Sequence, residues 1–403
     1  MKKESDKNLR IFNKGSKYIM PTYNRLPAVF TSAKMQYLWD ADGNKYLDFI
    51  AGYGCLNVGH SNKFVVKSIR KQAEKIIQSS NVYYNEAQVE LAEKLCRITE
   101  FGQKVFFANS GTEAIEGAVK LARKYARGKI SPQKYRIISF YKSFHGRTMG
   151  ALSATAQEEK QKVFQPLLEG FDYANLNDLD SVISKIDGKT CAILIEPIQG
   201  EGGINVASKE FLKALRELCD REKILLILDE VQTGFGRTGK MFAYQNYCLY
   251  PDILVVAKSL GGGMPIGAII STDEISSVFT PGRHGSTFGG NAASCAAGCA
   301  AIDYLLKNDL PGRAEVLGKY MMSKLLELKK KHSIIKDVRG MGLMIGMELA
   351  KPVAEGIVKN ALADRLVLNK VSDSILRFLP TLVITRKNID SLIDWLGANI
   401  SRY

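Results

Sequence analysis

The stretch ILLILD, residues 224–229, consists of five apolar residues followed by one aspartate. A short, continuous apolar run is typical of a strand that is buried on both faces of a parallel sheet. Similar runs recur between amphipathic, helix-like segments: KVFFA (104–108), YRIISF (135–140), CAILIE (191–196) and ILVVA (253–257). Because strands alternate with helices along the chain, the sequence predicts an α/β fold with a mostly parallel sheet between helices.

Both ends of the chain depart from this alternation. The stretch 37–49, YLWDADGNKYLDF, predicts two strands joined by a tight turn. After about residue 290, an Ala- and Cys-rich helical segment precedes two runs that suggest a separate small α+β unit, GMGLMIGMEL (340–349) and ILRFLPTLVIT (375–385). We expect a large domain and a smaller α+β domain formed by the two chain ends. The expected limits are 1–55 for the N-terminal part of the small domain, 56–290 for the large domain and 291–403 for the C-terminal part of the small domain.

Composition narrows the class of protein. The chain has 403 residues and a hydrophobic content of 46%, which is enough to bury a large core. The first residues are polar and no apolar stretch is long enough to span a membrane, so we expect a cytoplasmic protein with no membrane partner. The seven cysteines and four histidines are scattered without a CxxC pair. We therefore expect reduced thiols and no metal site.

The net charge of +15 raises the question of nucleic-acid binding. The basic residues are, however, spread along the chain. The densest run, Lys329–Lys331, falls in a helix-like stretch whose apolar positions account for one face, which leaves these lysines on a solvated face. We expect no nucleic-acid partner, because the positive charge is better explained by the binding of anionic small molecules.

Residues 234–240, GFGRTGK, formally match both the GxGxxG dinucleotide pattern and the GxxxxGK phosphate loop. Neither match has the right context. A dinucleotide fingerprint opens directly after a strand and runs into a helix, whereas DEVQT intervenes here. Met241 stands where the phosphate loop requires Ser or Thr. The sequence also contains no GxSxG or HExxH motif, which removes the basis for a serine hydrolase or a zinc protease.

Polar groups follow the expected strands at their carboxyl ends, where open α/β sheets bind ligands. KVFFA is followed by Ser110, Gly111 and Thr112 at the start of a helix-like stretch. Hydroxyls and a glycine at a helix N-terminus can cradle a phosphate, and an ordinary helix cap is the alternative. YRIISF is followed by Phe144 and Arg147. The ring can stack on a flat heterocycle and the guanidinium can bind a carboxylate, although each alone fits a core or surface role.

Two charged residues end the next strands. ILLILD ends with Asp229, whose burial is costly without a cationic partner such as a protonated pyridine nitrogen. ILVVA is followed by Lys258, the first residue of the Gly-rich stretch KSLGGGMPIG. A lysine becomes a nucleophile if the pKa of its ammonium group is lowered. Alone, Lys258 could equally extend into solvent. The set of phosphate cradle, aromatic ring, buried acid and lysine indicates a cofactor site.

These residues lie in motifs that resemble the class III, fold type I, pyridoxal-phosphate aminotransferases. The resemblance runs from about Pro21 to the end, through FFANSGTEA, SFHGRT, EPIQGEGG, LLILDEVQTGFGRTGK, AKSLGGGMPIGA, HGSTFGGN, VRGMGLMIG and LRFLP. Within the family, the chain is most similar to the enzymes that act on N-acetylornithine. The resemblance implies a seven-stranded type of sheet, pyridoxal 5'-phosphate as cofactor, and ping-pong transfer of the donor's terminal amino group to 2-oxoglutarate.

The resemblance also implies roles around the cofactor. Lys258 would hold the cofactor as a Schiff base, and Asp229 would pair with the pyridine nitrogen. The other cofactor-binding residues would be Ser110, Gly111, Thr112, Phe144, Val231, Gln232 and Thr287. Thr287 would come from the neighbouring subunit, which implies a homodimer with shared active sites.

The residues implied to bind substrate are Tyr23, Tyr53, Arg147, Glu201, Ser286 and Arg377. Arg147 would bind the α-carboxylate of the donor. Glu201 would screen Arg377 while the terminal amine reacts, and would then release it to bind the α-carboxylate of 2-oxoglutarate. This pair favours an aminotransferase with two alternating substrates over an aminomutase or a decarboxylase that uses the same cofactor.

The sequence departs from the acetylornithine pattern at several places. Tyr53 stands where these enzymes usually carry Ile, and it matches a tyrosine of ornithine δ-aminotransferases. Ala292 and Thr381 replace prolines, and Ser61 and Asn62 interrupt the usual GHxHP, changes that affect loop rigidity. Tyr53 therefore leaves free ornithine, succinylornithine or another ω-amine as alternative donors.

Overall fold

The structure is a computed structural model that describes residues 7–403. Its centre is a seven-stranded sheet with the order β4-β12-β11-β10-β7-β5-β6. The strands are β4 (Lys104–Ala108), β5 (Arg136–Phe140), β6 (Phe171–Ala174), β7 (Thr190–Ile195), β10 (Leu225–Asp229), β11 (Ile253–Val256) and β12 (Gly267–Ser271). Within this sheet, β12 is antiparallel to both of its neighbours and the other pairs are parallel. The predicted α/β fold with a mostly parallel sheet is confirmed.

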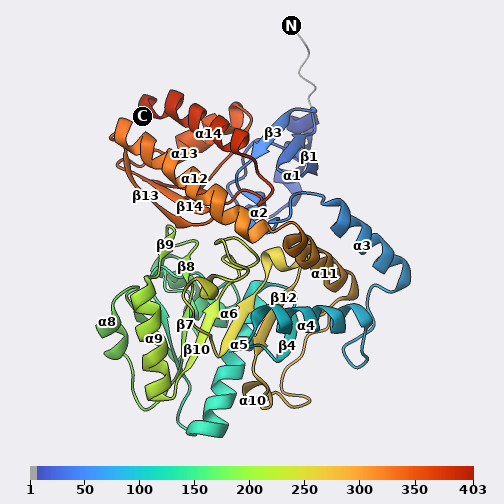
Figure 1. Cartoon of the computed structure of the whole chain (residues 1–403), viewed down its shortest axis with the longest axis vertical. Helices are drawn as coiled ribbons and strands as arrows, with labels where there is room; N and C mark the ends of the chain where they lie inside the picture. Colours follow the sequence, from blue (N-terminus) through green and yellow to red (C-terminus); the bar gives the residue numbers. More distant parts are fainter. Residues whose placement is uncertain (1–6) are drawn as a thin grey trace.

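Helices cover both faces of this sheet (Figure 1). Leu226 and Leu228 of β10 pack in the core cluster that contains residues of α9 (Lys209–Glu222). The intervening Ile227 packs in a second cluster with residues of α5 (Gly111–Tyr125). Burial on both faces explains why ILLILD is apolar at every position before its aspartate.

The two chain ends form the smaller α+β domain that the sequence predicted, at the top of Figure 1. One sheet has the order β1-β2-β3-β15, in which β15 pairs with β3 and so joins the C-terminal part to the N-terminal part. A second, antiparallel sheet has the order β13-β14-β17-β16. The strands are β1 (Phe30–Lys34), β2 (Tyr37–Asp40), β3 (Lys45–Asp48), β13 (Ile335–Met341), β14 (Met344–Leu349), β15 (Leu366–Val367), β16 (Asn369–Ser372) and β17 (Ile375–Phe378).

The remaining elements connect and cover these sheets. The helices are α1 (Lys7–Tyr18), α2 (Ala51–Gly54), α3 (Lys63–Lys75), α4 (Glu86–Thr99), α6 (Met149–Ala154), α7 (Glu158–Gln161), α8 (Leu179–Ile183), α10 (Asp273–Ser276), α11 (Ala292–Lys307), α12 (Leu310–Lys331), α13 (Ala354–Ala363) and α14 (Arg386–Asn399). A two-stranded sheet pairs β8 (Ile198–Gln199) with β9 (Asn205–Val206). Short 3-10 and π turns are η1 (Ala126–Ile130), η2 (Lys162–Phe164), η3 (Ala243–Asn246), η4 (Lys258–Gly261) and η5 (Ile400–Arg402).

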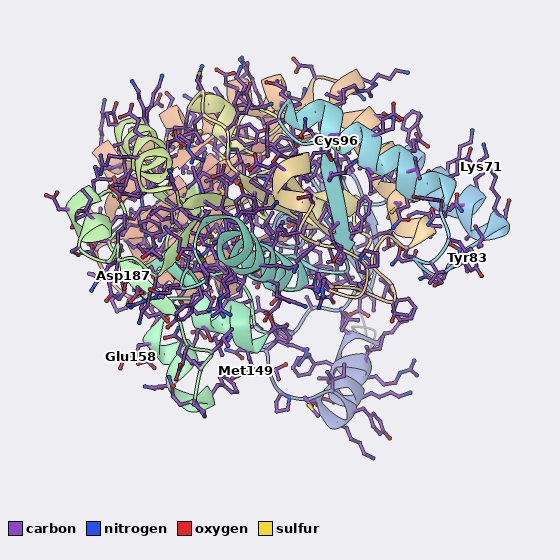
Figure 2. The ribbon with its side chains drawn as sticks, turned by 90° about the horizontal axis from the view of Figure 1, so that it is seen from below. Lys71, Tyr83, Cys96, Met149, Glu158 and Asp187 are labelled. Carbon is purple, nitrogen blue, oxygen red and sulfur yellow. The ribbon has the colours of Figure 1, made fainter. Side chains whose placement is uncertain are left out.

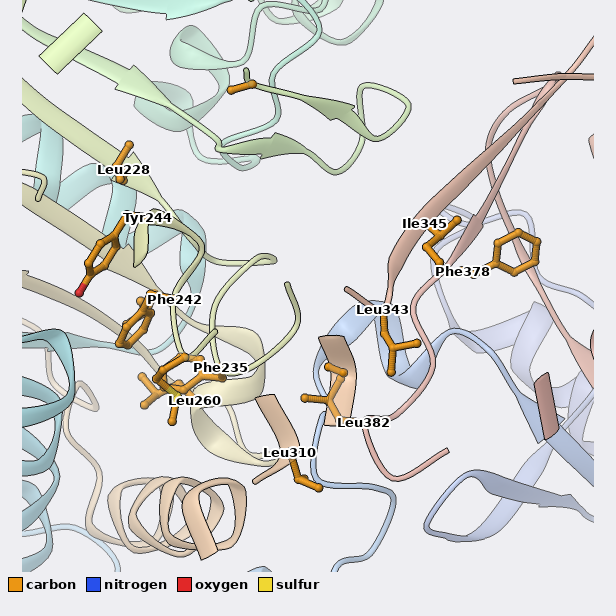
Figure 3. Packing of buried hydrophobic residues seen from close by; sticks show 14 of the residues in the cluster. Leu228, Phe235, Phe242, Tyr244, Leu260, Leu310, Leu343, Ile345, Phe378 and Leu382 are labelled. Atoms are coloured by element: carbon orange, nitrogen blue, oxygen red, sulfur yellow. The ribbon is translucent and has the colours of Figure 1, made fainter. Parts of the chain in front are cut away.

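One hydrophobic cluster spans both domains. Figure 3 shows it running from Leu228 and Tyr244, beside the large sheet, through Leu310 to Leu343 and Phe378 of the small domain. This shared core joins the small domain to the large one. The limits 1–55, 56–290 and 291–403 stay predictions, and residues 1–6 lie outside the described residues.

Within residues 7–403, the structure contains no helix with the length and apolar character needed to cross a bilayer. The seven cysteines are all free thiols.

Candidate active site

A cavity of about 450 Å³ opens where β4, β5, β10 and β11 end. These four strands run in the same direction, so the residues that follow them meet at one edge of the sheet. The predicted site residues that line the cavity are Ser110, Gly111, Thr112, Phe144, Arg147, Glu201, Asp229, Val231, Gln232 and Lys258. The fold therefore brings most of the predicted site together.

The N-terminus of α5 forms one wall. Ser110 is the N-cap, and its hydroxyl accepts a hydrogen bond from the main-chain N–H of Glu113 at 3.3 Å. A Cβ on Gly111 would lie 2.9 Å from Cγ1 of Val231, so only glycine fits without displacing that side chain. The hydroxyl of Thr112 is 2.9 Å from that of Thr148. Free N–H groups, hydroxyls and the positive end of the helix dipole suit a phosphate group.

Asp229 presents a buried carboxylate, with 4% of its surface exposed. Its Oδ1 accepts a hydrogen bond from the main-chain N–H of Val231 at 3.0 Å, and its Oδ2 lies 2.7 Å from Nδ1 of His145. His145 is itself buried, and no group within residues 7–403 hydrogen-bonds its Nε2. The carboxylate is thus held in a fixed orientation at the cavity wall.

A second buried acid supports the same wall. Glu196 follows β7 and accepts hydrogen bonds from the main-chain N–H groups of Phe144, at 2.9 Å, and Gly200, at 3.1 Å. Burial and the nearby negative charge of Asp229 raise the pKa of Glu196 well above its usual range, although His145 opposes the shift. Sequence reasoning missed His145 and Glu196. Glu196 ends an apolar strand just as Asp229 does, so the same signal was present.

Lys258 opens η4 with a φ of 44°, a left-handed conformation that is uncommon outside glycine and often marks functional sites. Burial lowers the pKa of its ammonium group, and the positive charge of Arg377 adds to the effect, while Glu201 opposes it. A lower pKa increases the fraction of the neutral amine, which is the nucleophilic form of lysine.

Arg377, on β17 of the small domain, has a fully buried side chain and lies beside the cavity, in contact with Glu201 and Gln232, which line it. Its Nη1 lies 2.5 Å from Oε1 of Glu201 and also donates to the carbonyl oxygen of Gly200 at 3.0 Å. Its Nη2 donates to Oδ1 of Asn369 at 2.8 Å. Burial alone would raise the pKa of Glu201, but the guanidinium of Arg377 holds it below its usual range. The ion pair leaves Arg377 neutralised at the edge of the cavity.

Like Arg377, four other predicted site residues are not part of the cavity lining. Tyr23 and Tyr53 are largely exposed and line a second cavity, of about 750 Å³, beside α1. The Tyr53 ring centroid is nevertheless only 5.5 Å from Cζ of Arg377. The hydroxyl of Ser286 accepts a hydrogen bond from the side-chain amide of Asn109 at 3.1 Å, and Thr287 is exposed. Their predicted roles stay predictions.

The groups around the cavity fit pyridoxal phosphate. A phosphate suits the N-terminus of α5, and the buried carboxylate of Asp229 suits a protonated ring nitrogen. Phe144 and Val231 line the cavity and can contact a flat ring, while Lys258 supplies an amine. By contrast, residues 7–403 contain no group of three or more His, Cys, Asp or Glu arranged to hold a metal ion.

The family model described as aminotransferase class-III matches residues 18–400. The chain belongs to the class-III aminotransferases. The family that the motifs indicated is therefore confirmed.

Individual members of this class-III aminotransferase family resemble the chain along most of its length. An acetylornithine aminotransferase of Caldanaerobacter subterraneus is 49% identical over 96% of this chain and 98% of its own. Ornithine aminotransferase 2 of Staphylococcus saprophyticus is 40% identical over 94% of this chain and 95% of its own. A solved ornithine aminotransferase of Toxoplasma gondii, described with partial occupancy of PLP at its active site, has a TM-score of 0.94 and 32% identity over 98% of this chain and 94% of its own.

Proposed function

We propose that the chain transfers the terminal amino group of N2-acetylornithine to 2-oxoglutarate, with pyridoxal phosphate as cofactor. The products are N-acetylglutamate 5-semialdehyde and glutamate, as in arginine biosynthesis. The ion pair between Glu201 and Arg377 carries the proposal. A free arginine beside Lys258 would attract the α-carboxylate of any amino acid and would bring its α-amino group to react. Neutralised by Glu201, Arg377 instead favours donors that react at their far end.

Different residues of the chain have different roles in the reaction. Pyridoxal phosphate, when bound, supplies a carbonyl that takes up the amino group and a ring that withdraws electrons from the reacting carbon. The carboxylate of Asp229 holds a proton at the ring nitrogen, and His145 keeps that carboxylate in place. The amine of Lys258, whose pKa burial lowers, would serve as the base that takes the proton from the reacting carbon and as the acid that returns it.

Two arginines serve the two substrates. Arg147 lines the cavity and binds the α-carboxylate of the donor in the first half-reaction. In the second half-reaction, Glu201 moves away and Arg377 binds the α-carboxylate of 2-oxoglutarate. Glu201 has 30% of its side chain exposed, so it has a path toward solvent, whereas Arg377 is fully buried and fixed by Asn369.

Tyr53 supports a second candidate function, that of an ornithine δ-aminotransferase. Its ring lies next to Arg377 of the ion pair, and about half of the residue is exposed to solvent. A phenol there can hydrogen-bond the free α-amino or carboxylate group of ornithine, while an acetylated donor places an apolar methyl group at that end.

A homodimer with shared sites is part of the proposal. The exposed residues Val82, Tyr83, Tyr84 and Phe288 lie near the loop that carries Thr287, and Tyr83 projects from one side of the molecule in Figure 2. Exposed aromatic residues of this kind commonly mark interfaces. Sedimentation velocity tests this directly: a species of twice the chain mass supports the dimer, and a monomer at micromolar concentration contradicts it.

The donor is tested by titrating the purified, cofactor-loaded protein with N-acetylornithine and, separately, with free ornithine, in the absence of any oxo acid. The cofactor's absorbance reports the transfer of the amino group. We expect conversion at a far lower concentration of N-acetylornithine than of ornithine. Preference for ornithine would replace the acetylornithine assignment with the δ-aminotransferase assignment.

A further inference from the structure

Two cations approach the ring of Phe144, which lines the cavity together with Arg147, whereas Lys160 reaches the ring from outside the lining. Cζ of Arg147 lies 5.6 Å from the ring centroid of Phe144, and Nζ of Lys160 lies 6.0 Å from it. The ammonium of Lys160 donates to the neutral side-chain oxygen of Gln157. No carboxylate within residues 7–403 lies in ion-pair contact with Arg147 or Lys160, so both charges are uncompensated.

The two cations differ in exposure, because Arg147 is open to solvent, which screens its charge. Lys160 lies on α7 and is half-buried. Burial and the positive charge of Arg147 together lower the pKa of Lys160, while Glu201 acts in the opposite direction. Arg377, the other arginine that we propose binds substrate, has its own carboxylate partner in Glu201. A carboxylate that contacts both side chains would offset this repulsion and accept a charge-assisted hydrogen bond from each cation.

Lys162, two residues further along the chain, is an ordinary surface lysine and serves as a comparison. Lys162 has 55% of its side chain exposed and pairs with Glu159 at 2.9 Å, as a solvated surface lysine commonly does. Figure 2 labels Met149 and Glu158, the first residues of α6 and α7, on the side of the molecule where this segment lies. Lys160 differs from Lys162 in being half-buried, unpaired and directed at the ring of Phe144.

We propose that Lys160 is a substrate-binding residue that, together with Arg147, binds the carboxylate farthest from the reacting carbon. This inference rests on the proposed function, because both of its substrates carry such a group. In N-acetylornithine it is the α-carboxylate, five atoms of chain from the reacting amine, and in 2-oxoglutarate it is the carboxylate opposite the oxo group. Two cations on one carboxylate strengthen binding equally before and during reaction, so the contribution falls on KM and leaves kcat unchanged.

The test compares Lys160→Met, which keeps the length of the side chain and removes its charge, with the matched control Lys162→Met. Steady-state kinetics gives KM and kcat for both substrates. Calorimetry gives the Kd of glutarate, a dicarboxylate that binds without reacting. We expect Lys160→Met to raise both KM values and the Kd of glutarate about tenfold, with kcat within about twofold of wild type. Lys162→Met should change none of these values, and Lys160→Arg should retain most of the affinity.

An unchanged Kd for glutarate in Lys160→Met, or a loss confined to kcat, would overturn the inference. Equal melting temperatures and cofactor absorbance in the variants and wild type show that folding and cofactor binding are intact. The glutarate measurement also separates this inference from the donor assignment. If the wild type does not use N-acetylornithine, yet Lys160→Met still weakens glutarate binding, the donor assignment fails and the role of Lys160 stands.

Discussion

Replacing Glu201 with glutamine should redirect the enzyme toward α-amino donors. In the native protein, an α-carboxylate can reach Arg377 only by displacing Glu201 from a 2.5 Å ion pair. Removing one partner of a fully buried pair typically costs about 3–5 kcal/mol. In this protein, 30% of the Glu201 side chain is exposed and Arg377 keeps its hydrogen bonds to Asn369 and Gly200. We therefore expect the cost of displacing Glu201 from Arg377 to be lower, about 2 kcal/mol, which corresponds to roughly thirtyfold in the selectivity between donors.

The assay is the single half-reaction of the cofactor-loaded enzyme, followed by absorbance, with glutamate and with N-acetylornithine as donors. Glu201→Gln should raise kcat/KM for glutamate relative to N-acetylornithine by about thirtyfold. Glu210→Gln, on the exposed first turn of α9, removes a similar charge from a residue that does not line the cavity, and it should leave the ratio unchanged. An unchanged ratio in Glu201→Gln would refute the screening role of this residue.

Other substitutions test the remaining parts of the site and the core. Asp229→Asn cannot hold a proton at the ring nitrogen, so turnover should fall at least about a hundredfold in steady-state assays, and full activity would contradict the role of Asp229. Gly111→Ala, whose Cβ would lie 2.9 Å from Val231, should raise the Kd of the cofactor about tenfold, as measured by fluorescence titration; an unchanged Kd would count against the cradle. Burial raises the pKa of Glu230 from 4.5 to about 7, so the stability that this group contributes is present below pH 4.5 and lost as pH rises through 7. In urea unfolding, the free energy of unfolding of Glu230→Gln should therefore rise by about 3 kcal/mol relative to that of wild type between about pH 4.5 and pH 8. A difference that stays constant with pH would refute the raised pKa of Glu230.

Continuous apolar runs made the central strands predictable. The strands β4, β5, β7, β10 and β11 begin and end within a residue of the runs identified in the sequence. Two strands of the same sheet were missed. The sequence of β12 begins with Gly267 and Ala268 directly after a Gly-rich turn, and β6, FDYA, lies at the sheet edge and carries a polar residue at its second position. Short strands with small or mixed residues lack the periodicity that signals a strand.

Sequence alone could predict those site residues whose place in the fold follows from the strand that they end. Asp229 and Lys258 end adjacent parallel strands, so any such sheet brings them to one edge. The contact between His145 and Asp229 crosses from β5 to β10 over the intervening β7, and no pattern along the chain encodes it. The unpaired charge of Lys160 likewise depends on which carboxylates lie near it in three dimensions.

The most direct test of the central claim is to locate the lysine that binds the cofactor. The purified protein is mixed with an equimolar amount of pyridoxal phosphate, reduced with borohydride, digested and mapped by mass spectrometry. We expect about one pyridoxyl group per chain, on Lys258, with transaminase activity lost in proportion to its modification. Modification spread over other lysines, with Lys258 unmodified and activity retained, would contradict the assignment of this cavity as the active site.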